Sequence, residues 1–591
     1  MSLLPASSIG DESIGFYKGV IDQSLRFEDG DSAYLLRTPS SAGNSKTLTI
    51  SMWVKRGNIS INSVLLNVFV SASPNNQGLL RFNSSDQLQF TNFSGEYDIV
   101  TNRLFRDTTN WYHILVRIDT TQSTDSERIK IYINGTLQTS LATSNYPSTE
   151  SMDLEWNTTN KHLIGARTDN STPTPIQRFD GYLAEINLRD GEALGPESFG
   201  ETKNGVWIAK KYTGSYGTNG FRLTFEATGT GTTAEGTDNS SNMTNIGDDK
   251  SGQGHNFSTS GLASTDVVKD SPENNFCVLN PLGKQSASAL SEGGLKTIIT
   301  SGTNSGRTPG TFAVNSGKWY WEVRQSSSNR FGMGVFDTEN YVMANEDGGV
   351  DAYEWVLVTN DNSGAAQLVN NSNYTNGYGG TVADGHVVMV ALDVDNGAIW
   401  FGKQGSWFNT DGSSDSDTVK GQIEGGTTTN AAFTSVTGRL TPSFIRQTSN
   451  NTIQVNFGQD ASFGGTESSA TKTDQNGIGA FQYNVPSGFL ALCSSNLPDV
   501  TFSAATSEQP SDYFNTFLYT GTNTVNKNYA LNTFTPDWVW LKSRGSDNHV
   551  VVDSSRVTGT HLASDAVYPN LHTNEADQEA SDAHPKIIAN G

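Results

Sequence analysis

The segment Thr47–Lys55, with the sequence TLTISMWVK, alternates apolar and polar side chains along its length. Two further segments, Trp111–Asp119 (WYHILVRID) and Arg128–Asn134 (RIKIYIN), repeat the alternation. Because successive side chains of a strand point to opposite faces, this period predicts strands with one face suited to burial, as in a two-sheet sandwich. Asn134 and Gly135, between IYI and TLQ, suit a type I′ hairpin turn, where both central residues need positive φ.

A second stretch of the chain has strands of the same kind. Asn396 and Gly397 again indicate a hairpin turn between two alternating strands. The strands expected in this stretch are Gly317–Val323 (GKWYWEV), Phe331–Asp337 (FGMGVFD), two within His386–Phe408, and Thr452–Gly458 (TIQVNFG). Further along, NTFLYTGTN, FTPDWVWLKSR, HVVVDSSR and the final KIIA predict a smaller β unit.

Composition favours an all-β chain and restricts its partners. Of 591 residues, 59 are glycine and only 17% are charged. Ser, Thr and Asn are frequent, and their side chains compete with helices for backbone hydrogen bonds. The net charge of −23 repels phosphate backbones, so we expect no nucleic-acid partner. No apolar run approaches the roughly 18 residues of a membrane span, so we expect no membrane insertion.

At about 150 residues per domain, the length predicts three or four domains. We expect tandem antiparallel β-sandwiches followed by a smaller partial β domain. The predicted parts are an N-terminal arm over 1–14, a first sandwich over 15–226, a linker rich in Gly, Ser, Thr and Asn over 227–275, a second sandwich over 276–495 and a C-terminal domain over 496–591. A thin last domain would be truncated or completed by a neighbouring chain.

Several sequence pieces carry family resemblances. SLRFEDGDSAYL, LTISMWVKRG, WYHILVRIDT, RIKIYINGTL and FDGYLAEINL occur in this order and together resemble the concanavalin A-like, laminin-G-like lectin family. GKWYWEV, FGMGVFD, DVDNGAIWF and NFG, also in order, resemble a SPRY (B30.2-like) sandwich. Each resemblance implies an antiparallel sandwich, in agreement with the strand pattern.

The tandem order is a further resemblance. A laminin-G-like module, the stretch DKSGQGHNF, a SPRY-like module and PDWVWLKSR together are similar to virion surface proteins of marine tailed phages. This resemblance implies a tail fibre or another structural protein of the virion. With its lectin-type modules, we expect a tail fibre or fibre-like appendage that binds a host cell-surface glycan and contacts other virion proteins. Multivalent attachment favours a homo-oligomer, and a trimer suits a fibre. The alternative is a capsid-attached fibre or decoration, or a tail structural protein, with no ligand of its own.

The start of the chain, MSLLPASSIGDESIGFYKG, lacks the basic and apolar regions of a signal peptide. We therefore expect synthesis in the host cytoplasm and a final location on the virion surface.

We expect a protein without enzymatic activity. Glucanases with the concanavalin-like fold need facing carboxylates, which on a strand requires acids at alternate positions. Glu575, Asp577 and Glu579 have this spacing but lie outside the first unit, in a segment without apolar alternation, which favours a solvated loop. The eight histidines match no zinc motif, and nucleophile-elbow and P-loop motifs are absent from the sequence.

Glycan binding requires exposed aromatic rings that stack on sugars. The candidates, all in the second unit and near Gly or Asn, are Tyr374, Tyr378 and Trp407. The alternative is that these rings cap the edge of the sandwich. Four tryptophans within strands are expected in the core instead, namely Trp53, Trp319, Trp321 and Trp400.

Calcium is the one candidate cofactor, because acidic side chains gather in turns. The candidate ligands are Asp29 and Asp31 in FEDGDS, and Asp411, Asp415 and Asp417 in TDGSSDSD. The alternative is that these are solvated turn acids.

The two cysteines, Cys277 and Cys493, flank the second unit. They would lie close together if the first and last strands of that sandwich are neighbours. We expect two buried free thiols, and the alternative is a disulfide bond between them.

Overall fold

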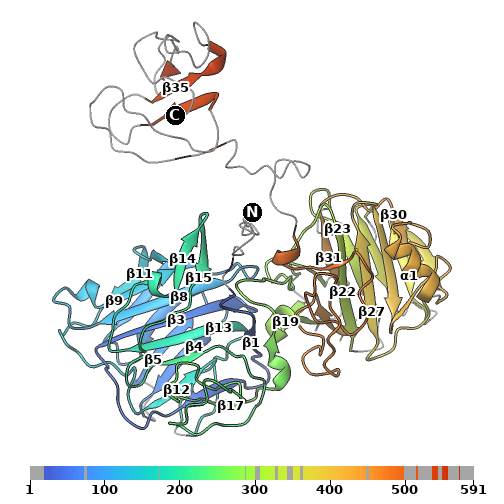
Figure 1. Cartoon of the computed structure of the whole chain (residues 1–591). Helices are drawn as coiled ribbons and strands as arrows, with labels where there is room; N and C mark the ends of the chain where they lie inside the picture. Colours follow the sequence, from blue (N-terminus) through green and yellow to red (C-terminus); the bar gives the residue numbers. More distant parts are fainter. Residues whose placement is uncertain are drawn as a thin grey trace. The chain divides into compact units, whose positions relative to one another are not determined.

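The computed structural model describes residues 17, 19–71, 76–170, 172–285, 288–299, 306–326, 330–341, 351–359, 364–414, 416–446, 451–497, 514, 516, 536–542, 549–556 and 571–572. The chain divides into two compact units, Met1–Leu497 and Pro498–Gly591. The first unit contains two antiparallel β-sandwiches and the second a three-stranded sheet (Figure 1). The predicted all-β fold is therefore confirmed, and α1 (Ser416–Glu424) is the one α-helix of the described residues. The N-terminal arm, NTFLYTGTN except Thr516, KIIA and the Glu575–Glu579 acids lie outside those residues.

The first sandwich has two eight-stranded sheets. One contains, in spatial order, β10 (Thr136–Leu137), β9 (Ile129–Ile133), β8 (Tyr112–Asp119), β3 (Thr47–Arg56), β13 (Gly181–Asp190), β1 (Ser24–Phe27) and β18 (Val267–Val268), with β16 (Phe221–Leu223) paired to β13. The other contains β11 (Leu141–Asn145), β7 (Asp98–Leu104), β6 (Gln87–Asn92), β5 (Gln77–Phe82), β4 (Ser63–Phe69), β12 (Lys161–Ile164), β2 (Tyr34–Arg37) and β17 (Ser258–Ser260). The three strands predicted first correspond to β3, β8 and β9.

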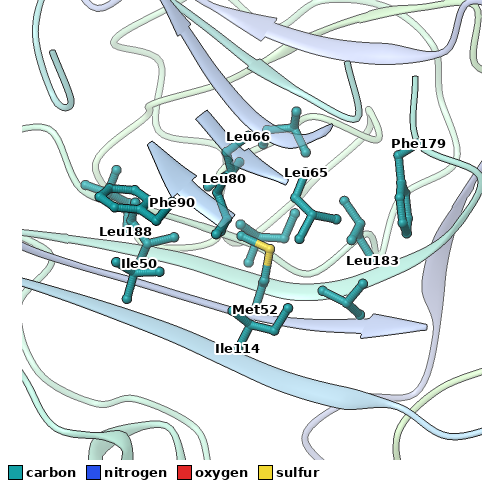
Figure 2. Packing of buried hydrophobic residues seen from close by; sticks show 14 of the residues in the cluster. Ile50, Met52, Leu65, Leu66, Leu80, Phe90, Ile114, Phe179, Leu183 and Leu188 are labelled. Carbon is teal, nitrogen blue, oxygen red and sulfur yellow. The ribbon is translucent and has the colours of Figure 1, made fainter. Parts of the chain in front are cut away.

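The core of this sandwich lies between the two sheets. Figure 2 shows Ile50 and Met52 of β3 in one cluster with Leu65, Leu80 and Phe90 of the opposite sheet. These are the apolar positions of the alternating pattern, so the inward face was predicted correctly. The hairpin turn after β9 is also confirmed, because its two central residues have φ values of 48° and 76°.

The outer face of β3 is buried as well, contrary to the one-sided burial that alternation predicts. A two-stranded hairpin, β14 (Gly200–Lys203) and β15 (Val206–Ala209), belongs to this outer layer. Its Trp207 donates a hydrogen bond from Nε1 to Nδ1 of His113 (3.1 Å), whose Nε2 lies 2.9 Å from Ser51 Oγ. Polar outward residues of β3 and β8 are thus covered and hydrogen-bonded.

The segment 227–275 is not the linker that its composition predicts. β17 pairs with β2 and β18 pairs with β1. Ile246 and Phe257 are buried in the core of the first sandwich. The polar residues fold the segment locally, because a carboxylate oxygen of Asp248 accepts hydrogen bonds from the backbone N–H groups of Thr244 and Asn245, each at 2.8 Å. This segment completes the first sandwich, which we therefore define as residues 19–275.

The second sandwich, residues 276–497, also has two sheets. The larger contains β19 (Ser288–Ser291), β20 (Lys296–Ile299), β32 (Asn451–Asn456), β22 (Lys318–Gln325), β27 (Val387–Asp393), β28 (Ala398–Lys403) and β29 (Ser406–Trp407), with β30 (Phe433–Thr434) beside β28 and β33 (Leu490–Ala491) beside β22. The smaller contains β21 (Arg307–Pro309), β31 (Leu440–Arg446), β23 (Phe331–Asp337), β24 (Glu354–Val358), β25 (Gln367–Asn370) and β26 (Asn373–Asn376).

The predicted hairpin between β27 and β28 is present, with Asp393 paired to Ala398. Gly397 has a φ of 62°, but the φ of Asn396 is not positive. This turn therefore differs in type from the one at Asn134 and Gly135, where both central residues have positive φ. All four tryptophans predicted for the interior are buried. Trp319 and Trp321 lie between the sheets, whereas Trp400 and, in the first sandwich, Trp53 belong to clusters on outer sheet faces.

The two ends of the second sandwich are neighbours, as the sequence suggested. The backbone N–H of Cys277 donates to Leu492 O at 3.0 Å, and Phe276 forms a β-bridge with Cys493. Both cysteines are buried and free.

Buried charges join the two sandwiches within the first unit. Nζ of Lys55 on β3 lies 2.6 Å from Asp270 Oδ2, 2.7 Å from Asn275 Oδ1 and 2.8 Å from Phe276 O, where the second sandwich begins. Nη1 of Arg26 on β1 lies 2.6 Å from Oδ2 of Asp460 in the second sandwich. The joint is therefore built from specific ionic contacts.

The second unit contains β34 (Trp538–Leu541), β35 (Val550–Asp553) and β36 (Leu571–His572) in one sheet. The strands predicted within FTPDWVWLKSR and HVVVDSSR are confirmed. Within the described part of the whole chain, no helix has the length and apolar character needed to span a membrane.

Candidate functional site

The three aromatic candidates for glycan binding do not form one surface. Tyr374 on β26 is 52% exposed. Tyr378 is buried and packs edge-on against Phe408, with ring centroids 5.6 Å apart. Trp407 is buried in the outer cluster of the second sandwich, beside Tyr320. The prediction is wrong for Tyr378 and Trp407, because a ring enclosed by other side chains offers no face to a sugar.

The acids of TDGSSDSD do not converge either. Asp411 is exposed, and its Oδ1 accepts hydrogen bonds from N–H (2.9 Å) and Oγ (2.6 Å) of Ser413. Asp417 is exposed in the first turn of α1, and Asp415 lies outside the described residues. In the portion of the chain with described positions, no metal-ligating cluster includes Asp411 or Asp417.

The other predicted acidic loop does contribute to a cluster. One carboxylate oxygen from each of Glu28, Asp29 and Asp180 lies within 4.8 Å of the other two, and we call these residues the acidic trio. Asp31, the second residue predicted there, is exposed and does not belong to the trio. The sequence thus indicated one trio member and missed two.

Strand register brings the trio together. Glu28 and Asp29 follow β1, and Asp180 directly precedes β13, whose Gly181 pairs with Phe27 at the end of β1. Gly57, after β3, donates its backbone N–H to Asp180 O at 3.0 Å. Because the two strands are antiparallel neighbours, the last residue of β1 and the first residue of β13 lie at the same end of the sheet. The acid within FDGYLAEINL, Asp180, was the available signal, but only the strand pairing makes it a neighbour of Asp29.

The trio concentrates negative charge in a covered place. Asp180 is 1% exposed. Burial, together with the charges of Glu28 and Asp29, raises the pKa of Asp180 well above its ordinary value. Burial also raises the pKa of Glu28 to about 7. Three carboxyl groups at this separation need shared protons or a cation to coexist.

The second unit presents a pair of aromatic rings that the sequence interpretation did not single out. Trp538 and Trp540 are 50% and 48% exposed, and their ring centroids are 6.4 Å apart. Nζ of Lys542 lies 5.6 Å from the centroid of the Trp540 ring. The period of two in WVWLK was the available signal, because it places Trp538 and Trp540 on one face of β34, with Lys542 one residue beyond the end of the strand. Such rings can stack on the apolar faces of sugars.

Comparison with known proteins identifies the class of the first sandwich. Residues 29–197 match the family model described as the Concanavalin A-like lectin/glucanases superfamily. The first sandwich is thus a concanavalin A-like, laminin-G-like domain. Residues 509–586 match a domain of unknown function, DUF7483. No curated protein sequence matches the chain.

Three solved structures illustrate what the chain is similar to. The PSpry domain of TRIM65 is 15% identical with a TM-score of 0.23, covering 31% of this chain and 92% of that one. The SPRY domain of human HERC1 is 17% identical with a TM-score of 0.22, covering 30% and 96%. A heptameric SAP-like pentraxin from Limulus polyphemus is 17% identical with a TM-score of 0.23, covering 29% and 77%.

Proposed function

We propose that this chain is a tail fibre or fibre-like appendage on the virion surface of a tailed phage, and that it binds host-surface glycans without chemical change. The motif order that resembles virion surface proteins of marine tailed phages supports the location. The lectin-like class of the first sandwich supports a binding role.

The observation that carries glycan binding is the exposed pair Trp538 and Trp540. Two rings on alternate positions of one strand offer adjacent stacking faces, and Lys542 places an ammonium donor beside them for sugar hydroxyl or carboxylate oxygens. Each site would be weak alone. A homo-oligomer, with a trimer suited to a fibre, would raise the overall affinity by multivalency.

The experiment is binding of the purified full chain to a glycan array and to host cells, with and without the two rings. We expect the double variant Trp538→Ala/Trp540→Ala to lose about 10-fold or more in affinity, since each stacked ring contributes on the order of 1 kcal/mol. Tyr353→Ala, which removes a 44% exposed ring of the second sandwich, is the matched control. Equal binding by the double variant and the wild type would reject the tryptophan pair.

Location is tested separately by labelling intact particles with antibody against the chain. Signal at the tail supports the fibre. Signal spread over the capsid lattice would instead support a decoration without its own ligand, and release of reducing sugar from bound glycan would contradict binding without catalysis.

A further inference from the structure

Within the part of the chain that the structure describes, no ion pair joins the acidic trio to a lysine, arginine or histidine. Among the described residues, Arg26 and Lys296 form ion pairs nearby, and both contact other acids. Arg26 contacts Asp266, Glu292 and Asp460, which are separate from the trio. Three carboxyl groups therefore face one another while the nearby positive charges neutralise a different set.

One oxygen of the trio is buried without a partner. Asp180 is only 1% exposed, and its Oδ1 is buried and accepts no hydrogen bond. A buried carboxylate oxygen left in this way is costly unless something else satisfies it. A Cβ added to Gly57 would lie 1.8 Å from this oxygen, so only glycine at this position lets the Asp180 carboxylate take its place.

Two carboxylates of the trio, those of Glu28 and Asp180, also contact the second sandwich. Glu28 Oε2 accepts a hydrogen bond from the backbone N–H of Glu292, and Asp180 Oδ2 lies 3.4 Å from the N–H of Gly293. Both donors belong to the short 3-10 helix η4 (Glu292–Gly294), between β19 and β20. Whatever fixes the trio therefore also fixes this contact between the sandwiches.

We propose that Glu28, Asp29 and Asp180 bind one divalent cation, calcium by preference, and that this cation fastens η4 to the first sandwich. Oxygen-only donors suit a hard cation, and the trio itself offers no imidazole or thiolate that would favour zinc. Calcium accepts irregular sets of carboxylates, whereas magnesium requires near-octahedral geometry and retains water. The cation would supply the partner that Asp180 Oδ1 lacks.

The binding test uses the full chain, stripped with a chelator and titrated calorimetrically with calcium chloride alone. We expect one site per chain with a Kd near 10⁻⁴ to 10⁻³ M or tighter, on the order of extracellular calcium modules. Asp180→Asn and Asp29→Asn are expected to weaken binding at least 10-fold. Asp411→Asn, in the separate exposed turn, is the matched control and is expected to bind like the wild type.

The fastening is tested by hydrogen exchange of peptides that span Glu292–Leu295. Calcium should slow exchange there at least several-fold in the wild type and leave Asp180→Asn unchanged. If Asp180→Asn does not fold, Asp29→Asn gives the same comparison, since Asp29 is only partly buried.

Three results would overturn the cation site or its fastening role, and a fourth would overturn the preference for calcium. The first is no binding heat up to about 10 mM calcium chloride, well above the weakest affinities of such modules. The second is equal weakening by the Asp411 control. The third is binding without slower exchange in η4, which would reject the fastening. Tighter binding of magnesium than of calcium would reject the preference for calcium.

Discussion

The two sandwiches cover the outer faces of their larger sheets in different ways. In the first, the covered face carries His113, Ser51 and Lys55, which hydrogen-bond to side chains of the covering segments or to one another. In the second, α1 contributes Val419 and Ile423 to an apolar cluster that includes Met389 and Trp400. The first outer layer adds these hydrogen bonds and charges to an apolar cluster around Trp53, whereas apolar burial predominates in the second.

Each of the two sandwiches also buries a titratable group, and these groups predict opposite responses of stability to pH. The first sandwich buries a neutral imidazole, His113, whose pKa burial lowers from 6.5 to about 3. The second buries a carboxyl group, Glu322, whose pKa burial raises from 4.5 to about 7. Acid should therefore weaken the first sandwich through His113, and rising pH should weaken the second through Glu322.

The largest expected effect comes from removing Lys55, whose ammonium pairs with Asp270 while both side chains are fully buried. Lys55→Met leaves that carboxylate without its cation, and we expect a loss of about 3–5 kcal/mol in the free energy of unfolding of the first sandwich. Urea unfolding followed by hydrogen exchange of β3 peptides measures it, because the readout is confined to this sandwich.

The matched control is Lys46→Met, since Lys46 lies 3.7 Å from Asp153 and both side chains are exposed. A surface pair of this kind contributes less than about 1 kcal/mol. A similar loss in both variants would show that the outer layer of the first sandwich does not depend on buried charge.

The next effect concerns His113. Trp207 Nε1 donates to His113 Nδ1, so Nε2 carries the ring proton and donates to Ser51 Oγ. A second proton on Nδ1 would oppose the Trp207 N–H. Because the folded pKa lies below the unfolded value, stability present above about pH 6.5 is lost as pH falls, and one such group contributes about 3 kcal/mol between pH 7 and 4.

The measurement compares wild type and His113→Gln by hydrogen exchange of β8 at several pH values. We expect the acid-dependent loss to shrink in the variant. An unchanged pH slope would show that His113 becomes protonated in the folded chain without penalty.

The strands could be predicted because their pattern is local. Alternation within residues 47–55 fixes β3 and its inward face. The cover on the other face was not predictable, because it depends on distant pairings. Ser24 and Asp270, for example, are hydrogen-bonded across 246 residues of sequence. The Gly- and Asn-rich composition of 227–275 indicated a linker, since composition does not reveal that Ile246 and Phe257 fill a core.

The candidate site was only partly predictable for the same reason. The turn containing Asp29 was identified, but Asp180 becomes its neighbour through the pairing of Phe27 with Gly181. Tyr378 lies in a loop that suggests exposure, yet Phe408 covers its ring. Trp538 shows the converse, because a tryptophan within a strand suggests a core position.

Glu322 tests the second sandwich in the opposite direction. Its carboxylate accepts hydrogen bonds from the backbone N–H groups of Gln482 (2.9 Å) and Tyr483 (2.8 Å), but burial outweighs them and the pKa rises to about 7. The folded chain therefore holds a proton that the unfolded chain releases above about pH 4.5. Stability should fall by about 2 kcal/mol from pH 5 to 7.

Hydrogen exchange of β22 peptides in wild type and Glu322→Gln measures this contribution. The fall between pH 5 and 7 should disappear in the variant, which cannot titrate. A fall of the same size in both proteins would assign it to other groups and remove the contrast with His113.

The smallest expected effect concerns Cys277 and Cys493, where the second sandwich closes. The chain ends meet there through backbone hydrogen bonds, and both thiols are free. Reductant should therefore leave the unfolding free energy unchanged. Burial raises the pKa of the Cys277 thiol to about 11 and that of Cys493 to about 12. Since the thiolate is the reactive form, both should resist a thiol reagent at pH 8 until urea unfolds the chain. Rapid labelling of the native chain would mean that this closure opens independently of the rest of the sandwich.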